Sequence, residues 1–366
     1  MPINIVKNGD YLPHQAIVLA KKENIYDFKL EKVIPAYEKR NKEQLKYPVW
    51  EVEVHPVDFC GLGCRGCSYT ERHSGNTINL ENLVKTIKQF EQFDLRTVFF
   101  SGGGDPCAWE EWRVFLDLIG GRKWELGMST NLFEFTNIRD IIHEFEFFQI
   151  HVVGYNSESM FRETGVSAFD KLENNYEELF GKKVDSQFVT MKVLLRNQNY
   201  KEIKNYLDFI SKFDCNAVVI KMEQNFMRNG KVNQRIQFHE VRQLILEHSI
   251  LNKFDYFFDN LEDAVYDNPI PSHCYVANSG LYILIRADGN IYPCVAGTFN
   301  VKNACGSIGK INEYDYKKVE EGFYDQLMKE KVCPLGACRH YRFNSIIERY
   351  KQGCSFENIQ IEPKLL

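Results

Sequence analysis

The apolar positions of this chain follow two alternating patterns from about residue 47 onward. Short runs rich in β-branched and aromatic residues, several of them bounded by Gly, Asn or Asp, have the length and composition of β-strands. Parallel strands of this kind are buried on both faces, so their runs can be almost continuously apolar. The predicted strands are Val49–Phe59, Thr97–Phe100, Trp124–Met128, Phe147–Val153, Phe188–Leu195 and Ala217–Ile220.

Between these runs the apolar residues recur every three or four positions, as on the buried face of a helix. Strand–helix alternation favours right-handed βαβ units and a parallel sheet. Six strands are fewer than the eight of a closed barrel, so the pattern predicts an α/β fold with an open or partial barrel. Ligands of such a fold bind on the loops that follow the strands. The predicted helices are Leu80–Phe93, Trp109–Ile119, Ile138–Phe145, Lys171–Phe180 and Tyr200–Phe213.

We expect the alternation to stop near residue 225, where a polar, glycine-containing stretch is typical of a linker. Farther on, two apolar runs flank Asp288-Gly289, a pair that favours a tight turn and predicts a β-hairpin over residues 280–295. The predicted domains are an N-terminal extension (1–46), the barrel (47–225), a helical linker region (226–268, with helices at Gln237–Leu251 and Asn252–Val265) and a small cysteine-bearing domain (269–366).

Composition and charge exclude several classes of protein. With 44% hydrophobic residues among 366, the chain has enough apolar material for a large core, so it is not a disordered tail. A net charge of -5 argues against a strongly basic nucleic-acid-binding face. No apolar run approaches the ~18 residues of a membrane-spanning helix, and the N-terminus lacks the pattern of a signal peptide. We therefore expect a cytoplasmic protein that binds neither nucleic acid nor a membrane.

Eleven cysteines are the most informative feature of the composition, because in a reducing cytosol closely spaced cysteines are typical of metal or catalytic sites. Cys60, Cys64 and Cys67 lie on one glycine-rich stretch directly after the first predicted strand. Thiolates are the usual ligands of iron–sulfur clusters, and three of them on a four-iron cluster leave one iron open. The alternative is a zinc site completed by His55 or His73.

Cys-x3-Cys-x2-Cys after a first strand resembles the signature of the radical S-adenosylmethionine superfamily. The resemblance covers about residues 48–225 and implies a partial (β/α)6 barrel. It also implies a 4Fe-4S cluster whose open iron binds S-adenosylmethionine, which is cleaved reductively to a 5′-deoxyadenosyl radical. Members often carry an aromatic residue just before the third cysteine. That position is Gly66 here, and Tyr69 is the nearby candidate for the adenine contact.

A glycine-rich stretch, Ser101 to Pro106, follows the second predicted strand. Successive glycines allow close approach of a ligand to the backbone. The stretch resembles the superfamily's Gly-Gly-Glu element, which implies that Gly102, Gly103 and Gly104 bind S-adenosylmethionine, with Asp105 where the acid often stands. We expect a side chain at position 103 to fill the space that the methionine moiety approaches. An ordinary turn is the alternative.

Polar residues also follow the later strands, and each of them can instead be an ordinary solvated residue. By the same resemblance, Ser129 and Asn131 can bind the ribose or the carboxylate of the cofactor. Lys192 and Arg196 lie four residues apart around the end of the fifth predicted strand, on one face of it. Further candidates at the end of the fourth predicted strand are His151, Tyr155 and Asn156.

A second group of cysteines, Cys274, Cys294, Cys333 and Cys338, brackets the predicted hairpin. A hairpin brings two ligands together and a later pair can complete a four-thiolate site. This spacing resembles the auxiliary-cluster domain of many radical S-adenosylmethionine enzymes, in its shorter one-cluster twitch form. The related two-cluster SPASM form needs additional closely spaced cysteines, which do not follow Cys338. A zinc ribbon is the alternative. Cys107, Cys215, Cys305 and Cys354 have no assigned role.

These motifs favour an oxidoreductase that abstracts hydrogen from an organic small molecule and uses the auxiliary cluster to take up an electron. An electron donor of the flavodoxin or ferredoxin type is implied. A maturase that modifies a peptide or protein is the second hypothesis. It is less favoured because only about 45 residues precede the barrel, fewer than a separate peptide-recognition domain needs. A non-catalytic iron–sulfur or zinc protein is the third.

Overall fold

A computed structural model provides the structure of the chain. It describes residues 4–7, 49, 51–67, 69, 75–93, 95–196, 198–222, 238–248, 256–260, 282–295, 304–310 and 352–353.

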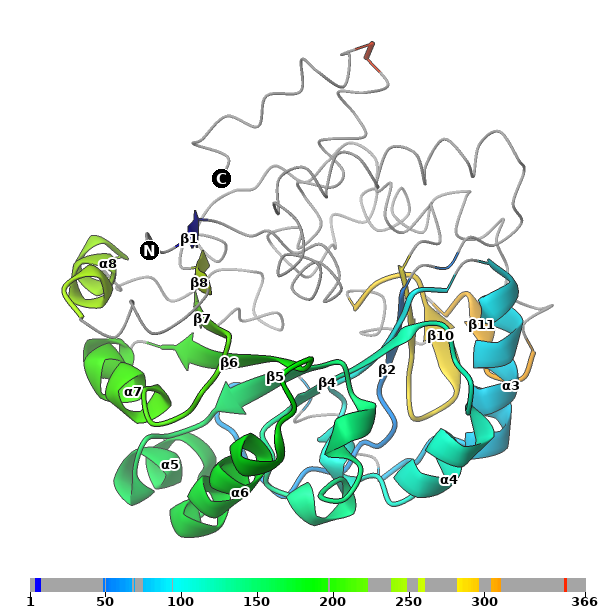
Figure 1. Cartoon of the computed structure of the whole chain (residues 1–366), viewed down its shortest axis with the longest axis horizontal. Coiled ribbons are helices and arrows are strands. Elements are labelled where there is room, and N and C mark those ends of the chain that lie inside the picture. The colour runs from blue at the N-terminus through cyan, green and yellow to red at the C-terminus, as the bar shows by residue number, and fades with distance from the viewer. Residues whose placement is uncertain are drawn as a thin grey trace.

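The described strands form one curved sheet (Figure 1). Neighbouring strands are parallel from β1 to β9 in the order β1-β8-β7-β6-β5-β4-β3-β2-β9, and β10 and β11 extend the β9 edge in antiparallel fashion. The strands are β1 (Asn4–Lys7), β2 (Glu51–Val54), β3 (Thr97–Phe100), β4 (Glu125–Thr130), β5 (Phe147–Val152), β6 (Phe188–Leu195), β7 (Ala217–Met222), β8 (Tyr256–Asn260), β9 (Tyr282–Ile285), β10 (Asn290–Tyr292) and β11 (Gly306–Ser307).

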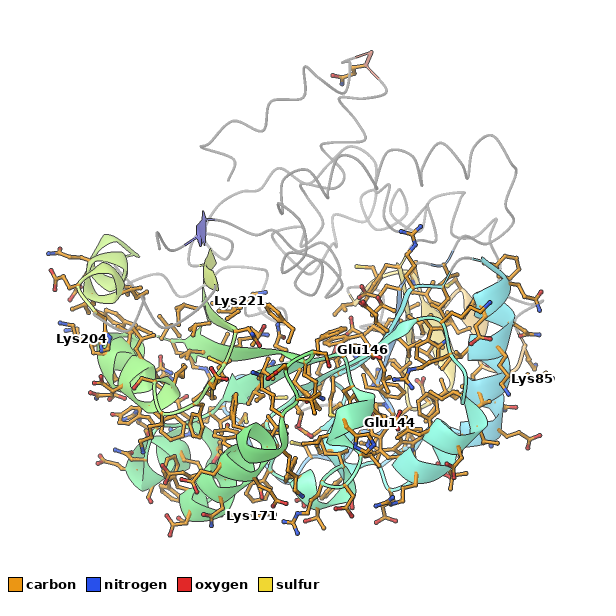
Figure 2. All side chains as sticks on the ribbon, viewed as in Figure 1. Lys85, Glu144, Glu146, Lys171, Lys204 and Lys221 are labelled. Atoms are coloured by element: carbon orange, nitrogen blue, oxygen red, sulfur yellow. The ribbon has the colours of Figure 1, made fainter. Side chains whose placement is uncertain are left out.

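Helices cover the convex face of this sheet. Figure 1 shows α3 to α7 as a continuous outer layer, with α3 at the β9–β11 end and α7 toward β8. The exposed Lys85, Lys171 and Lys204 mark the outer surface of this layer in Figure 2. The helices are α3 (Leu80–Phe90), α4 (Trp112–Leu118), α5 (Ser157–Thr164), α6 (Phe169–Lys182), α7 (Ile203–Ile210) and α8 (Phe238–Leu246).

The six predicted strands correspond to β2 to β7, which confirms the parallel sheet of a partial barrel. The predicted helix at Ile138–Phe145 is wrong. Its apolar residues are buried at helical spacing as expected, but the N–H groups of Ile141, Glu144 and Phe145 donate to carbonyls three residues back, so the segment forms 3-10 turns instead of an α-helix. The 3-10 turns are η2 (Glu91–Phe93), η3 (Pro106–Ala108), η4 (Phe135–Asn137), η5 (Ile142–Glu144) and η6 (Tyr200–Glu202).

The expectation that the alternation stops near residue 225 is also wrong. Helix α8 follows β7, and β8 then pairs in parallel with β7, so the βα pattern continues for another unit. The predicted helix at Asn252–Val265 is therefore a strand over Tyr256–Asn260. Its Tyr-Phe-Phe run has high strand propensity, and the free edge of β7 offers the backbone hydrogen bonds that complete it.

The predicted hairpin is confirmed by β9 and β10, which pair in antiparallel register with Ile291 opposite Ile285. Gly289 has a φ of 81°, a conformation that favours glycine in a tight turn. The hairpin does not stand apart from the barrel, because β9 pairs in parallel with β2 along its whole length. The predicted domain boundaries otherwise stay a prediction, and the helix suggested by Pro35–Leu45 lies outside the described residues.

The main hydrophobic core lies between the sheet and its helical layer. Alternate residues of each strand, such as Val52, Val54 and Phe100, point into it and are fully buried. Phe100 stacks edge-on against Trp112 with 4.6 Å between ring centroids. Each such large apolar side chain stabilises the fold by about 1.5–3 kcal/mol through burial.

The opposite, concave face of the sheet has an aromatic base. Phe99 of β3 and Phe147 of β5 stack there with ring centroids 5.6 Å apart. Gly127 of β4 lies between them, and a Cβ atom at that position would stand 2.0 Å from the Phe147 ring. A glycine is therefore required in the strand because the aromatic ring occupies the space of its side chain.

None of the described helices has the length and apolar character that crossing a bilayer demands.

Replacing Gly127 with Ala is expected to lower the free energy of unfolding by about 1–3 kcal/mol, because the new methyl group overpacks against the Phe147 ring. Gly181 in α6 is the matched control, since a Cβ there meets open space and Ala is a better helix former by ~0.5–1 kcal/mol. Urea denaturation followed by circular dichroism measures both. Equal stability changes in the two variants would contradict the packing argument.

Candidate active site

A cavity of about 300 Å³ opens on the concave side of the sheet, where the strands β2 to β7 end. We call it the cysteine cavity, because the three thiols of the loop after β2 line one end of it. Figure 2 shows Lys221, at the far end of β7, on the side of the sheet away from the helices. The described lining residues are Cys60, Leu62, Cys64, Gly66, Cys67, Tyr69, Gly102, Gly103, Gly104, Asp105, Ser129, Thr130, Asn131, His151, Val152, Val153, Glu163, Lys192, Leu194, Arg196, Asn199, Tyr206 and Lys221.

The cysteine loop rests on the glycine-rich loop after β3. The Gly104 N–H donates to the Val57 carbonyl at 2.8 Å, and the Asp105 N–H donates to the Phe59 carbonyl at 2.9 Å. These two bonds extend the β2–β3 pairing beyond the ends of the strands. They place Cys60 directly beside the glycines, so the two motifs that are 40 residues apart in sequence form one wall of the cavity.

Helix α5 holds the other side of the cysteine loop. The backbone N–H of Arg65 donates to the Glu163 carbonyl at 2.8 Å. Inside the loop, the Cys67 N–H donates to the Cys64 carbonyl at 3.2 Å, which turns the chain between the second and third thiols. The loop is therefore fixed by backbone contacts on both sides, and its three side chains face one space.

The glycines after β3 are needed for contact with the cysteine loop itself. A Cβ atom at Gly104 would stand 1.8 Å from the Phe59 carbonyl oxygen. Gly103 has a φ of 81°, and its Cβ would meet the Val57 carbonyl at 3.0 Å and the Asp58 carboxylate at 3.2 Å. The expectation that a side chain at position 103 fills cofactor space is therefore wrong, since it would displace the neighbouring loop instead.

Asp105 ties the glycine-rich loop to the end of β4. Its buried carboxylate accepts hydrogen bonds from the Thr130 hydroxyl at 2.7 Å, the Asn131 N–H at 2.8 Å and the Cys107 N–H at 2.9 Å. Burial raises the pKa of this carboxyl, and the three hydrogen bonds oppose that rise by stabilising the charged form. Asp105 lines the cysteine cavity, but most of its acceptor capacity is used within the protein.

The concave faces of β4, β5 and β6 place a polar group above the aromatic base. His151 Nε2 lies 3.1 Å from the Ser129 hydroxyl and 3.2 Å from Lys192 Nζ. Gln149 Oε1 accepts from the same two groups, at 3.3 Å and 3.4 Å. Parallel register brings these residues side by side, because His151 is opposite Lys192 and Ser129 is opposite Gln149.

Arg196 is the buried cation of the site. Its Nη1 donates to Glu163 Oε2 at 2.8 Å, and the Asn199 amide contacts the other carboxylate oxygen at 3.4 Å. Both charged side chains are more than nine-tenths buried. Arg196 lies close enough to Cys64 to lower the pKa of that thiol, although burial and the two other thiols raise it to about 12.

The thiols fit an electropositive iron–sulfur centre. Burial raises the pKa of Cys60 to about 11, and the Asp105 carboxylate and Cys67 add to the rise. Thiolates in this position need positive charge beside them, and iron ions supply it. The zinc alternative is not tested by the described residues, because one of its two candidate histidines lies outside them. His55 Nε2 contacts Glu53 at 3.1 Å, and His73 lies outside the described residues.

Two predicted residues belong to a helix cap and do not line the cavity. Asn156 is the N-cap of α5 and accepts from the Ser159 N–H at 2.8 Å. The Tyr155 hydroxyl donates to Glu202 at 3.1 Å. All the other predicted cofactor residues, including Tyr69, are lining residues. Their assigned contacts with a cofactor stay a prediction.

The second cysteine group is described only at Cys294, which is buried just after β10 and does not appear among the described lining residues. Cys274, Cys333 and Cys338 lie outside the described residues, as does Cys354. Among the unassigned cysteines, Cys107 is buried with its sulfur 3.0 Å from the Thr130 hydroxyl, and the Cys305 thiol contacts the Ile291 carbonyl at 3.4 Å.

Some lining residues were not predicted. Lys221 directly follows the sixth predicted strand, Ala217–Ile220, so the rule that ligands bind after the strands was sufficient to find it. Glu163 and Asn199 come from a helix and a loop, and no local pattern marks them. Thr130 lies between the predicted residues Ser129 and Asn131 at the end of a predicted strand, whereas Tyr206 is inconspicuous in the sequence.

One family of known proteins matches part of the chain. Residues 54–210 match the family described as the Radical SAM superfamily. No curated protein matches the chain.

Solved structures share the fold. Streptococcus suis SuiB bound to precursor peptide SuiA has a TM-score of 0.60 at 14% identity, over 89% of this chain and 79% of that one. SuiB bound to S-adenosylmethionine has a TM-score of 0.59 at 14% identity, over 89% and 78%. Native anSMEcpe with bound AdoMet and Cp18Cys peptide has a TM-score of 0.57 at 16% identity, over 83% and 99%. At these identities the likeness concerns the fold.

Replacing Glu163 with Gln is expected to lower the free energy of unfolding by about 3–5 kcal/mol, because the buried Arg196 then loses the carboxylate with which it forms an ion pair. Asp140→Asn is the control, since its ion pair with Arg113 is exposed and contributes less than about 1 kcal/mol. Chemical denaturation measures both. If both variants lowered the free energy of unfolding by less than about 1 kcal/mol, the charge of Glu163 would not be needed for stability.

Proposed function

We propose that this protein is a radical S-adenosylmethionine enzyme. In this proposal Cys60, Cys64 and Cys67 hold a 4Fe-4S cluster at one end of the cysteine cavity, and S-adenosylmethionine binds beside it. The observation that carries the proposal is the convergence of the three thiols and the glycine-rich loop on one cavity, both within the segment that matches the Radical SAM superfamily. Two structures of the same fold that contain the cofactor support it.

When bound, the cluster supplies one electron that cleaves S-adenosylmethionine to methionine and a 5′-deoxyadenosyl radical, which takes a hydrogen atom from the substrate. The chain's own residues orient the cofactor. Backbone groups of Gly102, Gly103 and Gly104 lie next to the thiols, where the methionine end would bind. The Tyr69 ring, which packs edge-on against His55 at 5.2 Å, forms a flat apolar wall suited to the adenine.

The polar residues of β4 to β6 bind the rest of the cofactor in this proposal. Ser129 and Lys192 present a hydroxyl and an ammonium group above the aromatic base, and these can hold the ribose and the carboxylate. Arg196 and Asp105 already have hydrogen-bond partners within the protein, so in this proposal they contribute charge to the wall of the cysteine cavity. The Asn131 amide faces Cys60 at 3.6 Å and is therefore better placed for the cluster than for the ribose.

We further propose that Cys274, Cys294, Cys333 and Cys338 hold an auxiliary 4Fe-4S cluster and that the net reaction is an oxidation. Such a centre would accept the electron that the substrate radical loses, and the accompanying proton would pass to a base or to water, so that an oxidised product and 5′-deoxyadenosine would remain. A centre held by four thiolates has no open iron for substrate, so electron transfer suits it. A flavodoxin- or ferredoxin-type protein supplies the first electron.

An organic small molecule is the favoured substrate, because a cavity of about 300 Å³ is at the lower end of the range for small-ligand sites and must also hold the cofactor. A peptide is the second candidate. Two structures with the same fold contain peptides, SuiA in one case and Cp18Cys in the other.

Anaerobic reconstitution is expected to load about eight irons per chain, because two sets of thiolates each hold four. The triple change Cys60→Ala, Cys64→Ala and Cys67→Ala should remove about half of the iron and abolish reductive formation of 5′-deoxyadenosine. Iron analysis and chromatography of the products measure the two effects. Tightly bound zinc with no iron–sulfur absorption after reconstitution would disprove the proposal.

Replacing Cys333 and Cys338 with Ala separates the redox role of the auxiliary cluster from a structural role. If the cluster accepts the electron, 5′-deoxyadenosine still forms with a reductant such as dithionite, but oxidised product is lost. Product and 5′-deoxyadenosine are quantified in the same reaction, with circular dichroism to confirm that the barrel stays folded. Unchanged product from a folded variant that lacks the cluster, or a redox-neutral product, would overturn this role.

A further inference from the structure

The side chain of Asn131 is held in a single orientation just after β4. Its Oδ1 accepts a hydrogen bond from the Phe133 N–H at 2.8 Å, and its own backbone N–H donates to Asp105 Oδ2 at 2.8 Å. The side chain is more than nine-tenths buried. With the oxygen committed to Phe133, the NH₂ group must point the other way, so the network itself distinguishes the two ends of the amide.

The loop around Asn131 is braced on both sides. Leu132 has a φ of 64°, a left-handed conformation that residues with a side chain rarely adopt, and its N–H donates to the Thr130 hydroxyl at 2.8 Å. Its carbonyl accepts from the Asn175 amide of α6 at 2.8 Å. A backbone held in this conformation by three elements keeps the Asn131 side chain where it is.

The NH₂ group of Asn131 is directed at the first thiol of the cysteine loop. Nδ2 lies 3.6 Å from the Cys60 sulfur, within the range of an N–H···S hydrogen bond. Asn131 and Cys60 are 71 residues apart, and they meet only because β4 and β2 end at the same edge of the sheet.

We propose that Asn131 acts through Cys60 to raise the reduction potential of the cluster that this loop holds. This inference rests on the proposed function. An N–H donor withdraws negative charge from a ligating thiolate, and the reduced cluster carries one more negative charge than the oxidised one. The donor therefore stabilises the reduced state more, which makes the first electron easier to deliver. It also offsets the nearby Asp105 carboxylate, whose charge has the opposite effect on the same sulfur.

The test is the reduction potential of the Asn131→Ser variant, measured by EPR-monitored redox titration of the reconstituted full-length protein. Serine keeps an oxygen that can accept from the Phe133 N–H, but its side chain has no amide donor and is too short to reach the sulfur. We expect the equilibrium constant for reduction to fall about tenfold, which for a one-electron couple is about 59 mV. Asn131→Asp, which adds a negative charge beside the sulfur, is expected to lower the potential further.

Asn137→Ser is the matched control, because it removes an amide donor, here to the Cys107 carbonyl at 2.9 Å, without touching Cys60. The titration follows the EPR signal that is lost in the Cys60→Ala, Cys64→Ala, Cys67→Ala variant. A lower potential in Asn131→Ser with an unchanged one in Asn137→Ser supports the inference. An unchanged potential in Asn131→Ser, or an equal shift in both variants, overturns it while the cluster is present. If the wild-type cysteine loop assembles no cluster, the proposed function fails, and the inference fails with it.

Discussion

The geometry of the site depends on the hydrogen bonds that the buried carboxylate of Asp105 accepts. It accepts hydrogen bonds from the end of β4 through Thr130 and Asn131, while its own N–H reaches back to Phe59 of the cysteine loop. Three loops that follow three different strands are therefore joined at one residue. A buried charge without such donors would cost several kcal/mol, so the arrangement is stable only with all of them in place.

The sheet separates two environments, and this separation creates the cavity. The convex face carries the continuous apolar core against the helices. The concave face begins with the stacked rings of Phe99 and Phe147 and becomes polar toward the ends of the strands, at Gln149 and His151. Because side chains alternate along each strand, one sequence supplies both faces. The polar groups are therefore concentrated where a ligand can reach them.

The β9–β10 hairpin is attached to the cysteine loop by buried polar contacts, although the two are far apart in the sequence. Arg286 of the hairpin pairs with Asp58 of the cysteine loop at 3.3 Å. The Tyr282 hydroxyl of β9 donates to Glu53 of β2, whose other carboxylate oxygen contacts His55. The segment that carries Cys294 is thereby attached to the loop that carries Cys60. These buried polar contacts couple the position of the hairpin to that of the cysteine loop.

The sequence by itself determined the strands β2 to β7, the hairpin turn and the motifs that line the cavity, because these depend on local periodicity, on glycine conformation and on spacing between cysteines. It did not determine that β8 extends the sheet, since the aromatic run at Tyr256 becomes a strand only when the edge of β7 is available. Only the tertiary structure decided that Glu163 neutralises Arg196, that the glycines accommodate the cysteine loop and that the Asn131 amide reaches Cys60. Those contacts join residues 33 to 71 positions apart. Local sequence patterns do not indicate which distant side chains the sheet brings to the same edge.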